Sequence, residues 1–323
     1  MSAPHSTARI EANGLSKSFG EIQAVRNVSF SVNPGEVVGF IGPNGAGKST
    51  TLRMLTGFLR PSEGSASIAG VDVLKHPIQA RLRFGYLPET GPLYGEMTVV
   101  EFLRFVAGAR RIRSVELDGD LIRVRKVCHL EKVWHQTIET LSKGYRQRVG
   151  LAQAIIHYPD CLILDEPTDG LDPNQKQEVR DLVNEMAAEK AILLSTHILE
   201  ELEAVCSRVI LLHQGEILLN ESLEAMRKRH PLFGSVKIRV APADADRSLS
   251  VFGKLEPFVE RIDRQGDHFL LRSRDKRNVS DAVLAVSKDA GLALLEVAPV
   301  IPRLEEVFQE LTRPQSKFIE EQG

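Results

Sequence analysis

The segment Gly42-Pro-Asn-Gly-Ala-Gly-Lys-Ser49 matches the phosphate-binding pattern GxxxxGK[ST]. Glycines in such a loop let backbone N–H groups converge on phosphate oxygens, and the helix that follows adds the positive end of its dipole. Lys48 would bring a positive charge to the β- and γ-phosphates, and the Ser49 hydroxyl would bind Mg²⁺. The motif therefore predicts a nucleotide site. Its residues are Gly42, Pro43, Asn44, Gly45, Ala46, Gly47, Lys48, Ser49 and Thr50.

Two adjacent carboxylates follow the apolar segment Cys161–Leu164 and form a second candidate group. Successive residues of a strand point in opposite directions, so Asp165 and Glu166 can serve different atoms. We expect Asp165 to reach Mg²⁺ and Glu166 to polarise a water molecule, because phosphoryl transfer requires positioning and charge neutralisation rather than covalent chemistry. An Asp-Glu pair after a strand is more often a helix cap, but downstream of a phosphate loop the catalytic interpretation is favoured.

Three apolar strands and one helix are predicted to hold these residues. Val37–Ile41 directly precedes the glycine-rich loop, and Lys48–Phe58 follows it with apolar side chains at helical spacing. Cys161–Leu164 and Ala191–Leu194 are two further buried strands, each of which ends at a polar loop. Strands that alternate with helices predict an α/β fold with a parallel sheet covered on both faces.

The rest of the chain is predicted to form a helical segment and a second domain. From about residue 88 to 158 the pattern is mostly helical, and Thr98 with Glu101 predicts a capping box. The first domain is expected to span residues 8–230. A small domain over residues 234–313 follows, in which strand and helix patterns occur in the order βαββαβ, typical of a ferredoxin-like α+β unit.

Composition excludes several classes of protein. The 323 residues carry 41 Lys+Arg and 43 Asp+Glu, a balance that argues against a duplex-DNA binder, so no nucleic-acid partner is expected. Three cysteines without a CxxC pair do not suggest a disulfide framework. The longest segments without a charge are Val37–Gly47 and Val149–Pro159, shorter than the roughly 18 apolar residues of a membrane helix. A soluble, cytosolic protein is therefore expected.

Further motifs resemble those of the ATP-binding-cassette (ABC) ATPases over roughly residues 8–230. LSKGYRQR (141–148) resembles the family's signature motif, Asp169-Gly-Leu-Asp172 its D-loop, and Ser195-Thr-His197 its switch-histidine loop. Phe19 lies where the family places an aromatic side chain under the adenine. The resemblance implies a P-loop NTPase with a mixed sheet core and a helical subdomain over about residues 88–158.

In this family two ATP molecules lie between two domains arranged head to tail, so the resemblance implies a dimer with a second copy of the chain. Glu166 would act as the catalytic base, and His197 would hold the γ-phosphate. The start of the predicted helix Lys143–His157 has free N–H groups that suit a γ-phosphate of the other copy. The residues expected to act in trans are Ser142, Lys143, Gly144, Tyr145 and Asp172. ATP and Mg²⁺ are the implied ligands.

Two positions depart from the family pattern. Glu89 in FGYLPE (84–89) stands where the family usually has Gln, in a loop that links Mg²⁺ to the membrane partner. Glutamate can still bind Mg²⁺, but its charge is expected to weaken nucleotide binding without metal. The signature has Lys143 and Tyr145 in place of Gly and Gln. Lys143 would either assist the γ-phosphate or face solvent.

The combination of GYLPE, the LSKGY signature and the tail LEEVFQELT resembles the ATPase subunits of bacterial exporters of the gliding-motility and multidrug type. The resemblance implies hydrolysis of ATP coupled to a separate membrane permease, at the cytoplasmic face of the cell membrane. An importer ATPase and a regulatory, non-transport ABC ATPase are the alternatives. The presence of both Glu166 and His197 favours an active ATPase.

Overall fold

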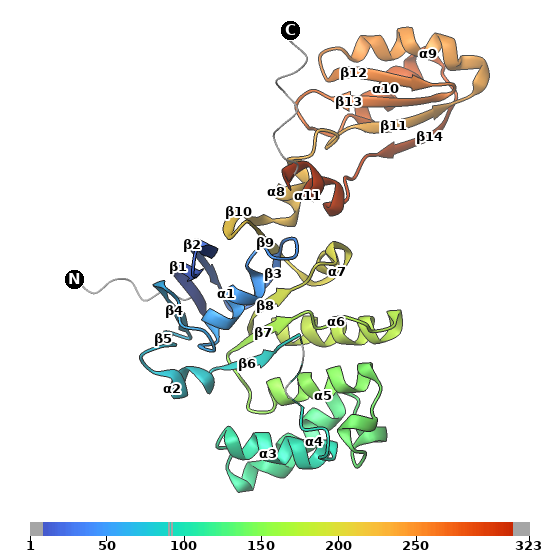
Figure 1. The fold of residues 1–323 in the computed structure, drawn as a ribbon. Helices are drawn as coiled ribbons and strands as arrows, with labels where there is room; N and C mark the ends of the chain where they lie inside the picture. The colour runs from blue at the N-terminus through green and yellow to red at the C-terminus, as the bar shows by residue number, and fades with distance from the viewer. Residues whose placement is uncertain (1–8, 90, 92, 313–323) are drawn as a thin grey trace. The chain divides into compact units, whose positions relative to one another are not determined.

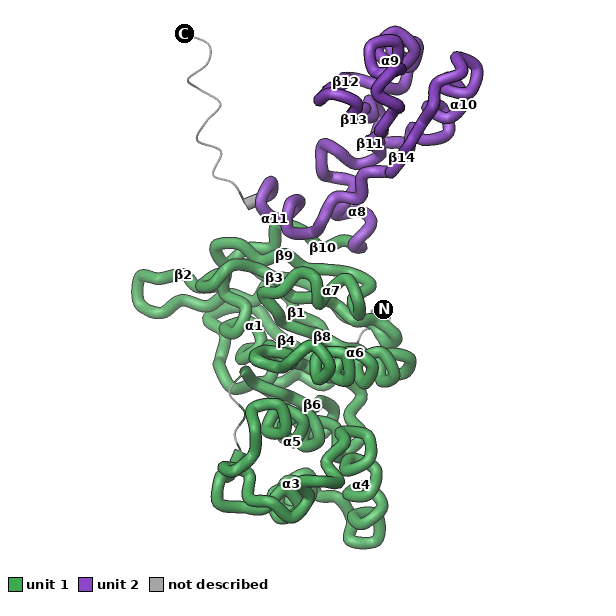
Figure 2. Tube along the Cα trace, turned by 90° about the vertical axis from the view of Figure 1, so that its right-hand side faces the viewer, with its two compact units in different colours: residues 1–221 green, residues 222–323 purple. Residues whose placement is uncertain are grey.

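The computed structural model describes residues 9–89, 91 and 93–312 of the chain. These residues belong to two compact units that divide between Glu221 and Ser222, and Figure 2 gives each unit its own colour. Each unit has its own hydrophobic core. Within the described ranges, no helix combines the length and the apolar character needed to cross a membrane.

A six-stranded sheet forms the centre of the first unit, with the strand order β10-β9-β3-β8-β7-β6. The pairs β3–β9, β3–β8, β7–β8 and β6–β7 are parallel. Every residue of β3, β7 and β8 is buried, as expected for a parallel sheet covered on both faces. The strands are β3 (Val37–Ile41), β6 (Phe84–Leu87), β7 (Cys161–Asp165), β8 (Ala191–Ser195), β9 (Arg208–His213) and β10 (Glu216–Ser222).

A second, antiparallel sheet of the first unit has the order β2-β1-β4-β5. Helix α1 (Lys48–Leu55) packs against β1, β2 and β4 of this sheet and against β7 of the central sheet, so its apolar side chains lie in the core. Gly57 has a φ of 71°, and α1 therefore ends before Phe58, where the sequence pattern placed its end. The strands are β1 (Ile10–Phe19), β2 (Ile22–Val32), β4 (Glu63–Ile68) and β5 (Val71–Asp72).

Between β6 and β7 the described chain is helical (Figure 1), as the sequence predicted. The predicted capping box is confirmed at α3, where the Thr98 N–H donates to the Glu101 carboxylate at 2.9 Å and the Glu101 N–H donates to Thr98 Oγ1 at 3.4 Å. The helical elements between β6 and β7 are α3 (Val99–Ala109), α4 (Ser114–Val127), η1 (Glu131–Val133), η2 (Ile138–Thr140) and α5 (Lys143–Ile155). Helices α2 (Pro77–Arg81), α6 (Pro173–Ala187) and α7 (Leu199–Val205) lie outside this segment.

The second unit contains an antiparallel sheet of order β12-β13-β11-β14. Its core includes Phe252 of α9 and Val283 of α10, so both helices contribute to the packing of the sheet. Helix α8 (Leu223–Lys228) packs against α11 (Leu304–Thr312). The elements between them are β11 (Val236–Val240), η3 (Pro242–Asp244), α9 (Ala245–Phe252), η4 (Gly253–Leu255), β12 (Val259–Gln265), β13 (His268–Ser273), α10 (Ser280–Ala290) and β14 (Leu294–Pro299).

Candidate nucleotide-binding and hydrolysis site

The predicted phosphate loop joins β3 to α1 and packs closely against neighbouring backbone. A Cβ atom at Gly42 would lie 2.2 Å from the Leu212 carbonyl oxygen, and one at Gly47 would lie 2.6 Å from the Ala24 carbonyl oxygen. Gly47 also has a φ of 103°, which favours glycine. Glycine is therefore required at both positions for the loop to lie against β2 and β9.

Lys48, the first residue of α1, folds back over this loop. Its Nζ donates to the Gly42 carbonyl oxygen at 2.7 Å and to the Pro43 carbonyl oxygen at 3.3 Å. Burial lowers the pKa of the ammonium group, while the carboxylates of Glu166, Asp165 and Glu89 act in the opposite direction. The positive charge of Lys48 thus lies among three carboxylates.

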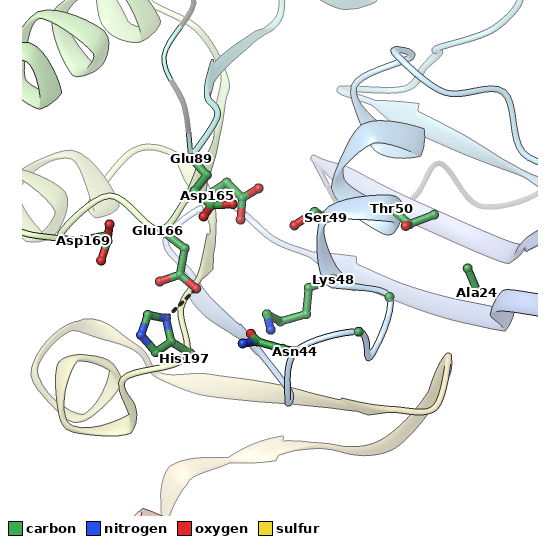
Figure 3. Close-up of a pocket in the computed structure, with 12 residues that line it drawn as sticks. Ala24, Asn44, Lys48, Ser49, Thr50, Glu89, Asp165, Glu166, Asp169 and His197 are labelled. Atoms are coloured by element: carbon green, nitrogen blue, oxygen red, sulfur yellow. Dashed lines mark ion pairs between the residues drawn. The ribbon is translucent and has the colours of Figure 1, made fainter.

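A cavity of about 340 Å³ lies beside the loop, as Figure 3 shows. Ten of the residues predicted from the sequence line it, together with Ala24 of β2 and Asp169, to which the sequence assigned no site role. The lining residues are Ala24, Asn44, Gly45, Gly47, Lys48, Ser49, Thr50, Glu89, Asp165, Glu166, Asp169 and His197.

The segments that line this cavity leave the carboxyl ends of four neighbouring strands. The phosphate loop follows β3, His197 follows β8 closely, Glu166 follows β7 directly, and Glu89 follows β6 closely. These strands are adjacent in the sheet order, so residues far apart in the sequence meet at one edge. The carboxyl edge of a parallel sheet is the usual place for a ligand site in an α/β fold.

Glu166 and His197 are in direct contact. The Glu166 Oε1 atom lies 3.0 Å from His197 Nδ1, and Figure 3 draws this pair as a dashed line. The backbone of Glu166 has a φ of 51°, a left-handed conformation that residues other than glycine rarely adopt. Its N–H donates to the Ser195 carbonyl oxygen at 2.9 Å, and Gln147 Nε2 donates to its carbonyl oxygen at 3.3 Å. Hydrogen bonds from two elements thus support this unusual backbone.

Asp165 is the buried neighbour of this pair, with only 4% of the residue exposed. Burial raises the pKa of its carboxyl group, the Ser195 hydroxyl and Lys48 oppose the rise, and the charges of Glu166 and Glu89 add to it. The pocket thus contains more negative than positive charge. A cation that binds beside Asp165 would relieve this repulsion.

Several predicted residues lie outside the cavity lining. Phe19 ends β1 and is 50% exposed. Ser142 is the N-cap of α5 and accepts a hydrogen bond from the Tyr145 N–H, while Asp172 is the N-cap of α6 and accepts one from the Gln175 N–H. Gly42, Pro43, Ala46 and Gly144 likewise do not line it. The roles of Phe19 and of the residues expected to act in trans stay predictions.

The half-exposed side chain of Lys143 forms an ion pair within the same chain. Its Nζ lies 2.6 Å from the Asp169 Oδ2 atom, and this bond is the main cause of the lowered pKa of the Asp169 carboxyl group. The pair connects the first turn of α5 to the wall of the nucleotide cavity. The sequence could not predict it, because 26 residues separate the two positions.

Comparison with known proteins places this geometry in a family. Residues 25–169 match the family model described as ABC transporter. The Nod factor export ATP-binding protein I of Cupriavidus pinatubonensis is 32% identical over 314 residues, which cover 97% of this chain and 93% of the relative. The chain belongs to the ABC transporter ATP-binding proteins. The bacitracin transport ATP-binding protein BcrA of Bacillus licheniformis is 34% identical over 68% of this ABC ATPase and 72% of the relative.

Solved structures agree with the fold of the first unit. A dimeric bacterial ABC transporter cassette has a TM-score of 0.62 and 25% identity, and the match covers 66% of this chain and 98% of the cassette. The same cassette is also known in a post-hydrolysis state with ADP and phosphate, with a TM-score of 0.61. This ABC ATPase is therefore an ATP-binding, ATP-hydrolysing subunit of a transporter with the P-loop fold of the family.

Proposed function

We propose that this ABC ATPase drives an exporter whose membrane permease is a separate polypeptide. The observation that carries the ATPase part is the contact between Glu166 and His197 in a cavity that Lys48 and Asp165 also line. The proposal of export rests on the relatives. The Nod factor export protein aligns with 97% of the chain, so the similarity extends into the second unit.

The residues of the cavity have distinct proposed roles in hydrolysis. Lys48 and the loop N–H groups bind the phosphates, and Glu166 accepts a proton from the water that attacks the γ-phosphorus. His197, in contact with Glu166, orients the carboxylate and the γ-phosphate. Because little covalent chemistry is required, the correct distance between these groups determines the rate. Phe19 is proposed to lie against the adenine.

Mg²⁺ is proposed to bind beside Ser49, Asp165 and Glu89. These side chains offer hydroxyl and carboxylate oxygens, the ligands that Mg²⁺ prefers, and the excess of negative charge around Asp165 suits a cation. The described residues contain no group of three or more His, Cys, Asp and Glu side chains that could enclose a metal. Phosphate oxygens and water would therefore complete the coordination, and the bound ion would neutralise phosphate charge.

A dimer of two copies is proposed as the active form. Ser142, as the N-cap, leads into α5, whose first N–H groups would meet the γ-phosphate bound to the other copy. Lys143, Gly144, Tyr145 and Asp172 would lie at the same interface. The dimeric cassette with 25% identity supports this arrangement.

The permease is proposed to dock at a second cavity of this chain, of about 490 Å³. Docking would hold the chain at the cytoplasmic face of the membrane. Phe58, which is 71% exposed, and Tyr86 give the cavity an aromatic wall, while Arg53, Arg81 and Arg110 give it positive charge. Glu89 and Asp165 line this cavity and the nucleotide cavity alike. A segment of the permease that binds here would therefore contact a residue of the nucleotide site.

Within the second unit we propose a ferredoxin-like domain over about residues 234–313, which follows an ATP-binding domain over about residues 8–230. Residues 8 and 313 lie outside the described part of the chain. The strands and helices of the second unit's domain follow the order βαββαβ, and its sheet has the order β14-β11-β13-β12, that is, strands four, one, three and two of the unit. Both features are typical of the ferredoxin-like arrangement. This scaffold has no function of its own.

Two substitutions test the proposed ATPase. Glu166→Gln should abolish hydrolysis while ATP still binds and stabilises a dimer detectable by size-exclusion chromatography. Lys48→Ala should weaken ATP binding itself. Lys132→Ala, at an exposed position outside the cavity, serves as the control. Hydrolysis by Glu166→Gln at the wild-type rate would contradict the assigned base.

Two further measurements test the transport part. The chain should co-purify with a membrane protein from detergent-solubilised membranes, and charge reversal at Arg81 should reduce that yield. Cells that lack the chain should accumulate the transported compound inside, which a comparison of internal metabolites would detect. Depletion of a compound inside these cells would instead support an importer.

A further inference from the structure

A buried carboxylate connects the loop after β7 with the helix that follows the His197 loop. Glu201 belongs to α7 and is only 4% exposed, although glutamate is rarely buried without a partner. Its Oε2 atom accepts a hydrogen bond from the Thr168 hydroxyl, which is buried as well. Its Oε1 atom lies 2.8 Å from Lys176 Nζ of α6. The three side chains form one connected group, and none of them lines the nucleotide cavity.

The positions of these residues along the chain connect the group to the proposed catalytic pair. Thr168 follows Glu166 by two residues in the loop after β7, and Glu201 follows His197 by four residues, in the helix after β8. The bond between Thr168 and Glu201 therefore joins the loop after β7 to the segment after β8 at a second point. The first point is the contact of 3.0 Å between Glu166 and His197.

The loop after β7 requires such support, because its backbone is strained. Glu166 has a φ of 51°, and a residue in this region keeps its conformation only when the surroundings determine it. The Asp169 N–H donates to the Glu166 carbonyl oxygen at 3.2 Å, which makes residues 166–169 a tight turn. Thr168 lies inside this turn, and its hydroxyl is the part that reaches Glu201.

Lys176 of α6 is the second partner of Glu201. Its side chain is 23% exposed, so water reaches it, whereas the Glu201 side chain is 5% exposed. Buried carboxylates are normally paired and hydrogen-bonded, and Glu201 has both an ion-pair partner and a hydroxyl partner.

We propose that Glu201 is a positioning residue for ATP hydrolysis, and that it fixes Glu166 relative to His197 by holding Thr168. This inference rests on the proposed function of the Glu166–His197 pair. Glu201 does not touch the nucleotide cavity, because it is absent from the residues that line it. The expected effect is therefore on the rate constant kcat, with the affinity for ATP unchanged.

Thr168→Val is the main test, because it keeps the shape of the side chain and removes the hydroxyl. We expect kcat to fall about 10- to 100-fold, the loss that a small misplacement of catalytic groups causes. KM and the Kd for ATP should stay within about twofold of the wild-type values, since the phosphate loop is untouched. Thr168→Ser retains the hydroxyl and should restore most of the activity.

A double-mutant cycle tests whether Glu201 acts through Thr168. Glu201→Ala should lower kcat as Thr168→Val does, and the double variant should lose no more than the larger single loss. Lys176→Met should have a smaller effect, because the bond to Thr168 remains. Each hydrolysis rate is divided by the concentration of chains that bind nucleotide. An unfolded fraction of the protein then does not affect kcat. If Thr168→Val does not fold, Thr168→Ala and Glu201→Gln take its place in the same cycle.

The outcomes separate this inference from the proposed function. If wild-type protein hydrolyses ATP, Glu166→Gln is inactive and Thr168→Val has wild-type kcat, Glu201 is not a positioning residue. Equal losses with Thr168→Ser and Thr168→Val, or multiplied losses in the double variant, would also overturn it. If Glu166→Gln remains active, the proposed function itself fails.

Discussion

Lys143 of the signature motif forms an ion pair of 2.6 Å with Asp169 of the same chain. The side chain of Lys143 lies over Gly170, where an added Cβ atom would be 2.2 Å from the Lys143 Nζ atom. Gly170 has a φ of 67°, which also favours glycine. A lysine in the signature and an Asp-Gly pair in the D-loop therefore match each other structurally.

Lys143→Ala should weaken ATP binding by leaving Asp169 as an unpaired negative charge on the cavity wall. Both side chains are about half exposed, so we expect a loss of about two- to fivefold, the range of partly exposed ion pairs. Titration with a fluorescent ATP analogue at low protein concentration measures the affinity. The difference should shrink at high salt, because salt screens exposed charges.

Comparing Lys143→Ala in wild-type and in Asp169→Asn protein shows how Lys143 acts. In Asp169→Asn protein, Lys143→Ala should no longer change the ATP affinity if Lys143 acts through Asp169. A loss of the same size in both backgrounds would mean that Lys143 instead binds phosphate of the other copy. Lys132→Ala again serves as the exposed control.

Glu89→Gln should strengthen ATP binding in the absence of metal. Glu89 lines the nucleotide cavity, and its charge adds to the negative field around Asp165. Removing one charge at short range in solvent is worth about 1 kcal/mol, or about fivefold in affinity. Isothermal titration with and without Mg²⁺ compares the two proteins. The prediction fails if Mg²⁺ improves ATP binding by the same factor in both.

Asp165→Asn should stabilise the nucleotide-free protein and inactivate it. Burial raises the pKa of Asp165 in the folded state, so folded protein binds the proton more tightly than unfolded protein. The unfolding free energy then falls as pH rises from the unfolded-state pKa to the folded-state pKa of Asp165, and the buried charge costs stability above that window. Asparagine has no charge to bury, so this cost disappears. Tm should rise by about 2–4 °C for each kcal/mol of unfolding free energy gained.

Calorimetry at neutral pH measures the change in stability, and a phosphate-release assay measures the rate. ATP hydrolysis should fall about 100-fold or more, because the variant lacks the carboxylate that we assign to Mg²⁺. A lowered Tm would contradict the explanation from burial. Glu189→Gln, outside the cavity, is a matched control for the loss of one acidic charge.

His157 should make the protein sensitive to acid. Burial, with the nearby Arg110 charge adding to it, lowers the pKa of this histidine to about 3, and its Nε2 lies 3.1 Å from the Phe84 carbonyl oxygen. Unfolded protein takes up a proton below pH 6.5 that folded protein does not. The unfolding free energy therefore falls as pH drops from about 6.5 towards 3, with a slope of at most about 1.4 kcal/mol per pH unit.

His157→Gln keeps a hydrogen-bond donor and removes the titration. Urea unfolding between about pH 4 and 7 should then show a shallower slope than in wild-type protein. Equal slopes would mean that His157 does not contribute to the acid sensitivity. Exposed His135→Gln is the control for loss of a histidine.

The phosphate loop and the carboxylates could be predicted because short motifs determine their own backbone geometry. The sequence placed the strand before the loop at Val37–Ile41, which are the bounds of β3. Asp165 and Glu166 follow an apolar strand, and parallel strands bring their carboxyl ends to one edge. Local spacing therefore contained enough information for this part of the site.

Contacts between distant segments could not be predicted in this way. In the sequence LEELEAV, nothing distinguishes Glu201 from Glu200 or Glu203, and only the packing of α7 makes Glu201 the buried one. Asp169 lines the cavity because it lies in a turn whose Asp169 N–H donates to the Glu166 carbonyl oxygen. Phe19 does not line the cavity, so its place against the adenine, suggested by its motif position, stays a prediction.

Glu89 belongs to two cavities at once, one with the phosphate loop and one with the aromatic and arginine wall. If Glu89 acts in nucleotide binding as proposed, a molecule that binds the second cavity and shifts Glu89 will change the free energy of ATP binding. Thermodynamic reciprocity then requires ATP to change the affinity of that molecule by the same factor. The coupling energy between nucleotide and partner can thus be measured in two ways: as the effect of the partner on ATP affinity, or as the effect of ATP on partner affinity.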